Sequence, residues 1–134
     1  MPFFFLSVAL LAVAPATDRC PARDFATFAT RFADDVAIQR KYTATPLIDD
    51  HIDANADPEP ATITRRLDAG TLRFPLMPNR AARAKDGLVL STRALAGGDH
   101  EATLAHPDSG YQIRYRFQRV RDCWQLVRRS DDSI

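Results

Sequence analysis

Residues 111–118 alternate strictly between apolar and polar side chains. The apolar members are Tyr111, Ile113, Tyr115 and Phe117, and the polar members between them are Gln112, Arg114, Arg116 and Gln118. A period of two sends successive side chains to opposite faces, so it predicts a strand with one face buried. A tight turn near Arg121 and Asp122 leads into a second apolar run, 123–129, which predicts a hairpin. A sheet of this kind needs another element to cover its apolar face.

The hairpin has a definite expected register. Folding it about the turn sets Phe117 opposite Leu126 and Tyr115 opposite Arg128. A slip of one residue would reverse the two faces. The residues expected to form a binding face of the cupped sheet are Tyr111, Tyr115, Phe117, Trp124 and Arg128.

Two further strands are predicted just before this hairpin. They cover residues 88–92 and 101–106, and turn-forming residues at 97–99 and 107–110 separate and end them. The pairing expected for the second of them sets His100 opposite Phe117. The last third of the chain therefore predicts a meander of antiparallel strands.

An amphipathic helix is predicted over residues 24–36. Asp24 is a typical capping residue, and the phenylalanines at 25, 28 and 32 follow the spacing of one helical face. Val36 extends the same stripe. Core packing explains such a stripe better than a cofactor site does, because a short helix is stable only when its apolar face is covered.

The middle of the chain offers weaker patterns. Residues 42–47 suit a short strand in which Pro46 marks either the end or an edge position. The acidic and proline-containing run 49–60 predicts a solvated loop, and 58–67 predicts a second helix. Residues 72–79 are expected to be extended, and 80–86 to form a polar linker or a short helix.

Helix and strands together predict an α+β fold, with the N-terminal amphipathic helix packed on a curved antiparallel sheet. The chain resembles a family of small secreted bacterial proteins of unknown function, similar to the nuclear-transport-factor-2-like, or cystatin-like, superfamily of cone-shaped α+β domains. The resemblance rests on Phe25-x-x-Phe28-x-x-x-Phe32 with Asp35 and Gln39, then x-Pro-Leu, and the closing Tyr111…Phe117…Cys123-Trp124-Gln125-Leu126-Val127. It implies a cone-like fold, and a fold does not settle function.

The N-terminal residues differ sharply from the rest. Residues 3–16 are uncharged and almost wholly apolar, and the first charged side chain is Asp18. This run is too short to span a bilayer, but it matches the hydrophobic region of a signal peptide, with cleavage expected after Ala16. We therefore expect a signal peptide at 1–16, one domain at 17–134, and a periplasmic or secreted protein without a stable membrane anchor. The residues before Cys20 do not fit a lipid-attachment site.

The mature chain contains two cysteines, Cys20 and Cys123. In an oxidising compartment we expect them to form a disulfide that closes a loop of about 100 residues, which would contribute roughly 4 kcal/mol in the chain-entropy estimate. The alternative is two buried free thiols.

No metal ion or cofactor is predicted. The histidines at 51, 100 and 106 lack metal-ligand spacing. Asp53-x-Asn55-x-Asp57 copies the start of a calcium loop, but Pro58 and Thr64 stand where that loop needs glycine and glutamate.

The densest basic region is the final hairpin, whose arginines are Arg114, Arg116, Arg119, Arg121, Arg128 and Arg129. The chain as a whole carries 18 basic and 17 acidic side chains. This balance and the expected export argue against nucleic acid as a partner. We expect most of the basic region to be a solvated sheet face, which the acidic residues 49–59 of the same molecule would oppose.

These observations favour an exported, non-enzymatic binding domain. Its partner would be a small molecule or a protein of unknown identity, bound through the cupped sheet or its basic rim. One alternative is an isomerase- or hydratase-like enzyme with Asp35 or His100 as acid or base in an apolar cone. The other is a periplasmic inhibitor or immunity protein.

Overall fold

The structure is a computed structural model that describes residues 19–57 and 59–134. The expected signal peptide, 1–16, lies outside the described residues, as does the expected cleavage after Ala16. Within those ranges no helix combines the length and the apolar character needed to cross a membrane.

Two consecutive helices open the described chain: α1, Phe25–Asp34, and α2, Val36–Lys41. The Asp24 carboxylate caps α1 by accepting the Thr27 N–H at 2.9 Å, as the sequence predicts. The phenylalanines at 25, 28 and 32 are all buried. The predicted extension of this stripe to Val36 is wrong. Asp35 has an extended backbone conformation that ends α1, and Val36, the first residue of α2, is exposed.

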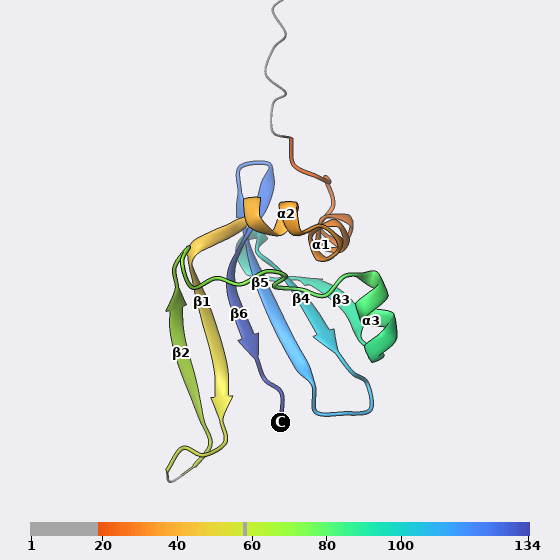
Figure 1. The fold of residues 1–134 in the computed structure, drawn as a ribbon. Coiled ribbons are helices and arrows are strands. Elements are labelled where there is room, and N and C mark those ends of the chain that lie inside the picture. Colours follow the sequence, from red (N-terminus) through yellow and green to blue (C-terminus); the bar gives the residue numbers. More distant parts are fainter. Residues whose placement is uncertain (1–18, 58) are drawn as a thin grey trace, which may run out of the picture.

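Six strands form one mixed sheet in the order β2-β1-β6-β5-β4-β3 (Figure 1). Their bounds are Thr43–Asp53 for β1, Ala61–Leu67 for β2, Val89–Ala94 for β3, His100–Ala105 for β4, Gln112–Val120 for β5 and Cys123–Asp131 for β6. All neighbouring pairs are antiparallel except β1 and β6, which run parallel. The predicted α+β fold is confirmed, and the sheet is mixed because β1 returns beside the last strand.

The expectations for residues 49–67 are wrong. The predicted solvated loop begins inside β1, and the predicted helix at 58–67 is strand β2. β1 tolerates its acidic residues because Asp49 and Asp50 meet Arg129 and Arg128 on the adjacent strand. β2 contains the β-branched run 62–64, which favours a strand over a helix.

A short helix, α3, Arg80–Asp86, follows as one of the two predicted alternatives for this segment. Asn79 caps it at the start, and Gly87 ends it with a φ of 65°, a conformation that suits glycine.

The final hairpin has the expected register at its turn and a different one beyond it. Phe117 pairs with Leu126 and His100 with Phe117, as predicted. The predicted pairing of Tyr115 with Arg128 is wrong, because a bulge at Val127 shifts the register and Tyr115 pairs with Arg129. Arg128 therefore lies on the opposite face of the sheet from Tyr115.

The helices cover one face of the sheet, which we call the inner face (Figure 1). Rings from α1 pack against Phe117 and Trp124, with centroids 5.1 to 5.7 Å apart. The connection from β2 to α3 also covers this face, since Leu76 and Met77 are buried. Two side chains hold that connection: Gln39, which bonds Leu76 N and Met77 O, and Tyr115, whose hydroxyl donates to Leu76 O at 2.8 Å.

Cys20 and Cys123 form a disulfide, with their Cα atoms 5.3 Å apart. It joins the segment before α1 to the first residue of β6. The pairing predicted from the sequence is therefore present, and it links residues 103 positions apart.

Candidate anion-binding groove

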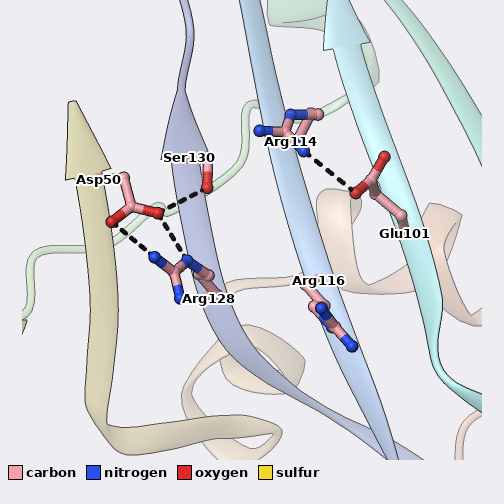
Figure 2. Close-up of a pocket in the computed structure, with 6 residues that line it drawn as sticks. All are labelled: Asp50, Glu101, Arg114, Arg116, Arg128 and Ser130. Carbon is pink, nitrogen blue, oxygen red and sulfur yellow. Dashed lines mark hydrogen bonds and ion pairs between the residues drawn. The ribbon is translucent and has the colours of Figure 1, made fainter. Parts of the chain in front are cut away.

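The outer face of the sheet, opposite the helices, contains three of the six arginines of the basic region noted in the sequence: Arg114, Arg116 and Arg128. A cavity of about 300 Å³ on this face is lined by Asp50, Glu101, Arg114, Arg116, Arg128 and Ser130. These side chains lie on the neighbouring strands β1, β6, β5 and β4 (Figure 2). The alternation of β5 and β6 places them there, because every second residue points away from the helices.

Each arginine of this outer cavity is neutralised by a carboxylate of the same molecule. Arg128 bonds Asp50 through two nitrogens, at 2.6 and 3.0 Å (Figure 2). Arg114 contacts Asp132 at 2.6 Å and Glu101 at 3.7 Å. Arg116 contacts Asp99 at 3.1 Å. The outer cavity is polar, but its charge is already balanced.

Asp50 is the most strongly held of these carboxylates. Burial alone would raise its pKa, but hydrogen bonds from Arg128, Thr64 and Ser130 outweigh burial and lower the pKa to about 2. Asp50 is thus ionised throughout the physiological range and stays paired with Arg128. This pair joins β1 to β6.

A second hollow of about 740 Å³ lies where β2 leads into the connection to α3. We call it the arginine groove, and its lining residues are Arg65, Arg66, Leu67, Thr71, Arg73, Pro75 and Arg129. Its four arginines come from three segments, which the pairing of β2 with β1 and of β1 with β6 brings together. Among the residues that the structure describes, no acidic one lines it.

One carboxylate, Asp49, balances two of the arginines. It accepts from Arg129 at 2.8 Å and from Arg65 at 3.3 Å, and it is itself buried. Arg73 donates to the carbonyl oxygens of Gly70 and Leu72, and no carboxylate of residues 19–57 or 59–134 forms an ion pair with it. Arg66 is exposed and has no ion pair with any described residue. The groove therefore has more positive charge than its one carboxylate neutralises.

Guanidinium groups with spare donors are suited to bind phosphate, sulfate or carboxylate groups. Thr71 also lines the groove, but its hydroxyl donates to Asp68, while Leu67 and Pro75 add apolar surface. The arrangement favours a ligand with an anionic group and some apolar surface.

A smaller cavity of about 330 Å³ adjoins the groove, because Arg65 and Arg129 line both. We call it the His51 pocket. Its lining residues are Asp49, Asp50, His51, Arg65, Leu76, Ile113, Tyr115, Arg129 and Asp131. In the described part of the chain, His51 Nδ1 is one of two buried side-chain polar atoms without a hydrogen-bond partner, the other being Trp124 Nε1.

The candidate acid and base residues from the sequence lie elsewhere. The Asp35 carboxylate accepts the Ala37 N–H at 2.8 Å and caps α2. The His100 ring packs between Phe25 and Trp124, and its Nδ1 lies 3.1 Å from Gly98 O. These positions give a structural reason for both residues, so they add no support to the enzymatic alternative.

The residues expected to form one binding face are divided by the structure. Tyr115, Phe117 and Trp124 are buried beneath α1 and the β2–α3 connection, and Tyr111 is partly buried. Arg128 lies on the outer face. A binding role for this set stays a prediction, and it requires movement of the covering elements before a ligand can reach the three buried rings.

In the ranges 19–57 and 59–134, no group of three or more histidine, cysteine, aspartate or glutamate side chains is arranged to hold a metal ion. Asp53, the first residue of the calcium-like run, accepts the Asn55 N–H within its own turn.

Sequence reasoning missed the arginine groove. The sequence patterns predict a helix for Arg65 and Arg66 and an extended segment for Arg73, and they mark none of the three as a site residue. The Thr-Ile-Thr run at 62–64 is the signal that would have indicated a strand there. Placing that strand beside β1 would have brought Arg65 close to the acidic pair at 49–50.

Comparison with known proteins identifies the fold. No family model matches the chain, and no curated protein matches it. A solved structure, that of an NTF2-like protein from Bacteroides fragilis NCTC 9343, matches 87% of this chain with a TM-score of 0.59. The chain has an NTF2-like fold. The resemblance noted in the sequence is confirmed at this level.

The two chains share 21% sequence identity, and this chain spans about half the length of the Bacteroides protein. Likeness at that level concerns the fold alone. The function of the NTF2-like chain must therefore be argued from its own residues.

Proposed function

We propose that this NTF2-like chain is an exported, non-enzymatic binding domain whose ligand carries an anionic group held in the arginine groove. The proposed location is the periplasm or the extracellular space. The disulfide between Cys20 and Cys123 supports it, because disulfides persist in oxidising compartments.

The observation that carries this proposal is the charge of the groove. Four arginines line one hollow of about 740 Å³, and Asp49 is the one carboxylate in contact with any of them among the described residues. An anion would neutralise Arg66 and Arg73 without displacing an existing ion pair. On the outer face an anion would have to compete with Asp50, Asp99 and Asp132 for arginines that are already paired.

The remaining candidate functions have no comparable support. The enzymatic alternative depended on Asp35 or His100 in an apolar cone, and the structure gives both residues structural contacts. An inhibitor or immunity role stays a prediction from the sequence.

Tripolyphosphate is a suitable probe, because it presents several anionic oxygens without apolar groups. We expect the purified protein to bind it by isothermal titration calorimetry at low ionic strength and more weakly at physiological salt. The double variant Arg66→Gln/Arg73→Gln should weaken binding about tenfold or more, since each charge-assisted hydrogen bond contributes about 1.5–3 kcal/mol.

The matched control is Arg93→Gln/Arg116→Gln, which removes the same net charge from the outer face. We expect it to change the Kd less than about twofold, because its arginines do not line the groove. Thermal unfolding of each variant checks that the fold is intact. Equal weakening by both double variants, or no binding by the parent protein, would contradict the proposal.

A further inference from the structure

The outer edge of β2 is open along the whole strand. β2 is the first strand in the sheet order and pairs with β1 on one side only (Figure 1). Every residue of β2 except Leu67 is exposed. On the free side of such a strand, the N–H and C=O groups of every second residue have no strand partner, so they are available to another strand. At the opposite edge of the sheet, β3 contacts α1.

β2 also lacks the features that usually protect an edge. Charged side chains, prolines and bulges keep edge strands from pairing with other chains. Residues 61–64 read Ala-Thr-Ile-Thr, without charge or proline, and the register between β2 and β1 is uninterrupted. The side chain of Ile63 remains 38% exposed. Because β-branched residues favour strands, this part of β2 is suited to pair with a further strand.

The two ends of β2 have opposite charge. Asp57 and Glu59 lie in the turn before the strand, both exposed and without an ion pair to any residue that the structure describes. Arg66 and Arg73 line the arginine groove at the other end, and they too have no carboxylate partner in the described ranges. An antiparallel strand of the same sequence therefore sets the acidic end of one copy beside the basic end of the other, twice in one pair.

We propose that β2 pairs antiparallel with β2 of a second copy of this chain, which joins the two sheets into one. Pairing centred on Ile63 sets the two Ile63 side chains opposite each other and Arg65 of one copy opposite Ala61 of the other. No arginine then faces an arginine, and Glu59 of each copy lies beside Arg66 of the other. The two-fold symmetry closes the assembly at two copies, because the same edge serves both.

This inference goes beyond the proposed function and shares Arg66 with it. An anionic ligand and the acidic turn of a second copy compete for this arginine, so each should weaken the binding of the other by the same factor. We expect saturating tripolyphosphate to raise the Kd of the dimer about threefold or more. The dimer itself does not require a ligand in the groove.

Sedimentation equilibrium on the purified, oxidised protein tests for the dimer. We expect a reversible transition from monomer to dimer between about 1 and about 500 μM, because one pair of strands forms a small interface of the weak class. Hydrogen exchange followed by NMR at both concentrations locates the contact: protection should rise at alternate amides of β2 and stay unchanged in β3. Ile63→Lys should weaken the dimer at least about tenfold, because two positive charges then stand opposite each other.

An exchange of charges tests the pairing of the two ends. The acidic-end variant is Asp57→Lys/Glu59→Lys, and the basic-end variant is Arg66→Glu/Arg73→Glu. Each alone sets like charges against each other at both contacts, so each should weaken its own dimer at least about tenfold. A mixture of the two variants restores opposite charges at both contacts. We expect it to form a heterodimer whose Kd lies within about threefold of the parent protein's.

The matched control is Asp108→Lys/Asp122→Lys, which makes the same charge change as the acidic-end variant at two exposed turns away from β2. It should dimerise like the parent protein, and thermal unfolding checks that every variant is folded. A parent protein that stays monomeric at all these concentrations, or folded variants that do not associate when mixed, overturns the dimer and leaves the anion groove standing. A dimer that is unaffected while tripolyphosphate binds also contradicts the proposed contact.

Two further results separate this inference from the proposed function. A protein that dimerises as expected but does not bind tripolyphosphate overturns the groove alone. A monomeric protein whose β2 amides become protected when an acidic peptide is added would assign the edge to a different partner, and the proposed dimer would be wrong.

Discussion

The outer cavity and the arginine groove are built from the same kind of side chain, and they differ in how those side chains are balanced. On the outer face, Arg114, Arg116 and Arg128 each contact a carboxylate. In the groove, Asp49 serves two arginines and the other two have none among the described residues. Density of basic residues in the sequence therefore does not locate an anion site. What distinguishes the two hollows is the number of carboxylates in contact with their arginines.

The difference follows from the sheet order. β6 lies between β1 and β5, so its arginines meet the acidic pair of β1 on one side. β2 is an edge strand, and Arg66 has no neighbouring strand on its outer side to supply an acid. The paired face is suited to stability, and the unpaired edge is suited to binding.

The largest expected effect comes from removing the acid that balances the outer face. Asp50→Ala leaves Arg128, Thr64 and Ser130 without their shared acceptor. We expect a loss of about 2–3 kcal/mol in the free energy of unfolding. This is at or below the lower end of the losses seen when a fully buried ion pair is broken, because Arg128 is half exposed. Urea denaturation measures this loss, with Asp122→Ala as the exposed control. A loss below about 1 kcal/mol would mean that the pair does not hold β1 to β6.

The second prediction concerns acid stability. The pKa of Asp50 is lowered from 3.8 to about 2, so its ionised form stabilises the fold above pH 3.8 and this contribution disappears as the pH falls through about 2. The stabilisation is about 2 kcal/mol. We expect the stability difference between the parent protein and Asp50→Asn to shrink over this window in urea titrations at successive pH values. A difference that is constant with pH would contradict the lowered pKa.

Much of the covered side of the sheet was readable from local patterns. The phenylalanine stripe of α1 and the pairing of Phe117 with Leu126 both follow from residues close in sequence. The disulfide is predicted by the expected export together with the even cysteine count. Each of these predictions needed only a period or a composition.

The candidate site was not readable in that way, because its parts are far apart in the chain. Asp49 and Arg129 are 80 residues apart, and the parallel pairing of β1 with β6 brings them together. An acidic run looks like a solvated loop until the arginines that neutralise it are placed. The bulge at Val127 had no local signal either, and it decides which face receives Arg128.

The third prediction concerns a variant in which the arginine groove has more uncompensated positive charge. Asp49→Asn removes the carboxylate shared by Arg65 and Arg129 and keeps its shape. We expect the Kd for tripolyphosphate to fall about fivefold, because two more guanidinium groups become uncompensated. Calorimetry on the variant, together with thermal unfolding, measures the gain and the accompanying loss of stability. Unchanged or weaker binding by a folded variant would mean that Asp49 does not limit the groove.

The smallest expected effect concerns the outer face, whose arginines are already paired with carboxylates. Arg116 contacts Asp99 at 3.1 Å, but half of its side chain is exposed, so the pair contributes less than about 1 kcal/mol. Arg116→Gln should therefore unfold within about 1 kcal/mol of the parent protein and bind tripolyphosphate with an unchanged Kd. If this variant instead weakened anion binding as much as we expect of Arg66→Gln/Arg73→Gln, a paired arginine would be as available to ligands as an unpaired one. The contrast between the balanced face and the unbalanced edge would then lose its physical basis.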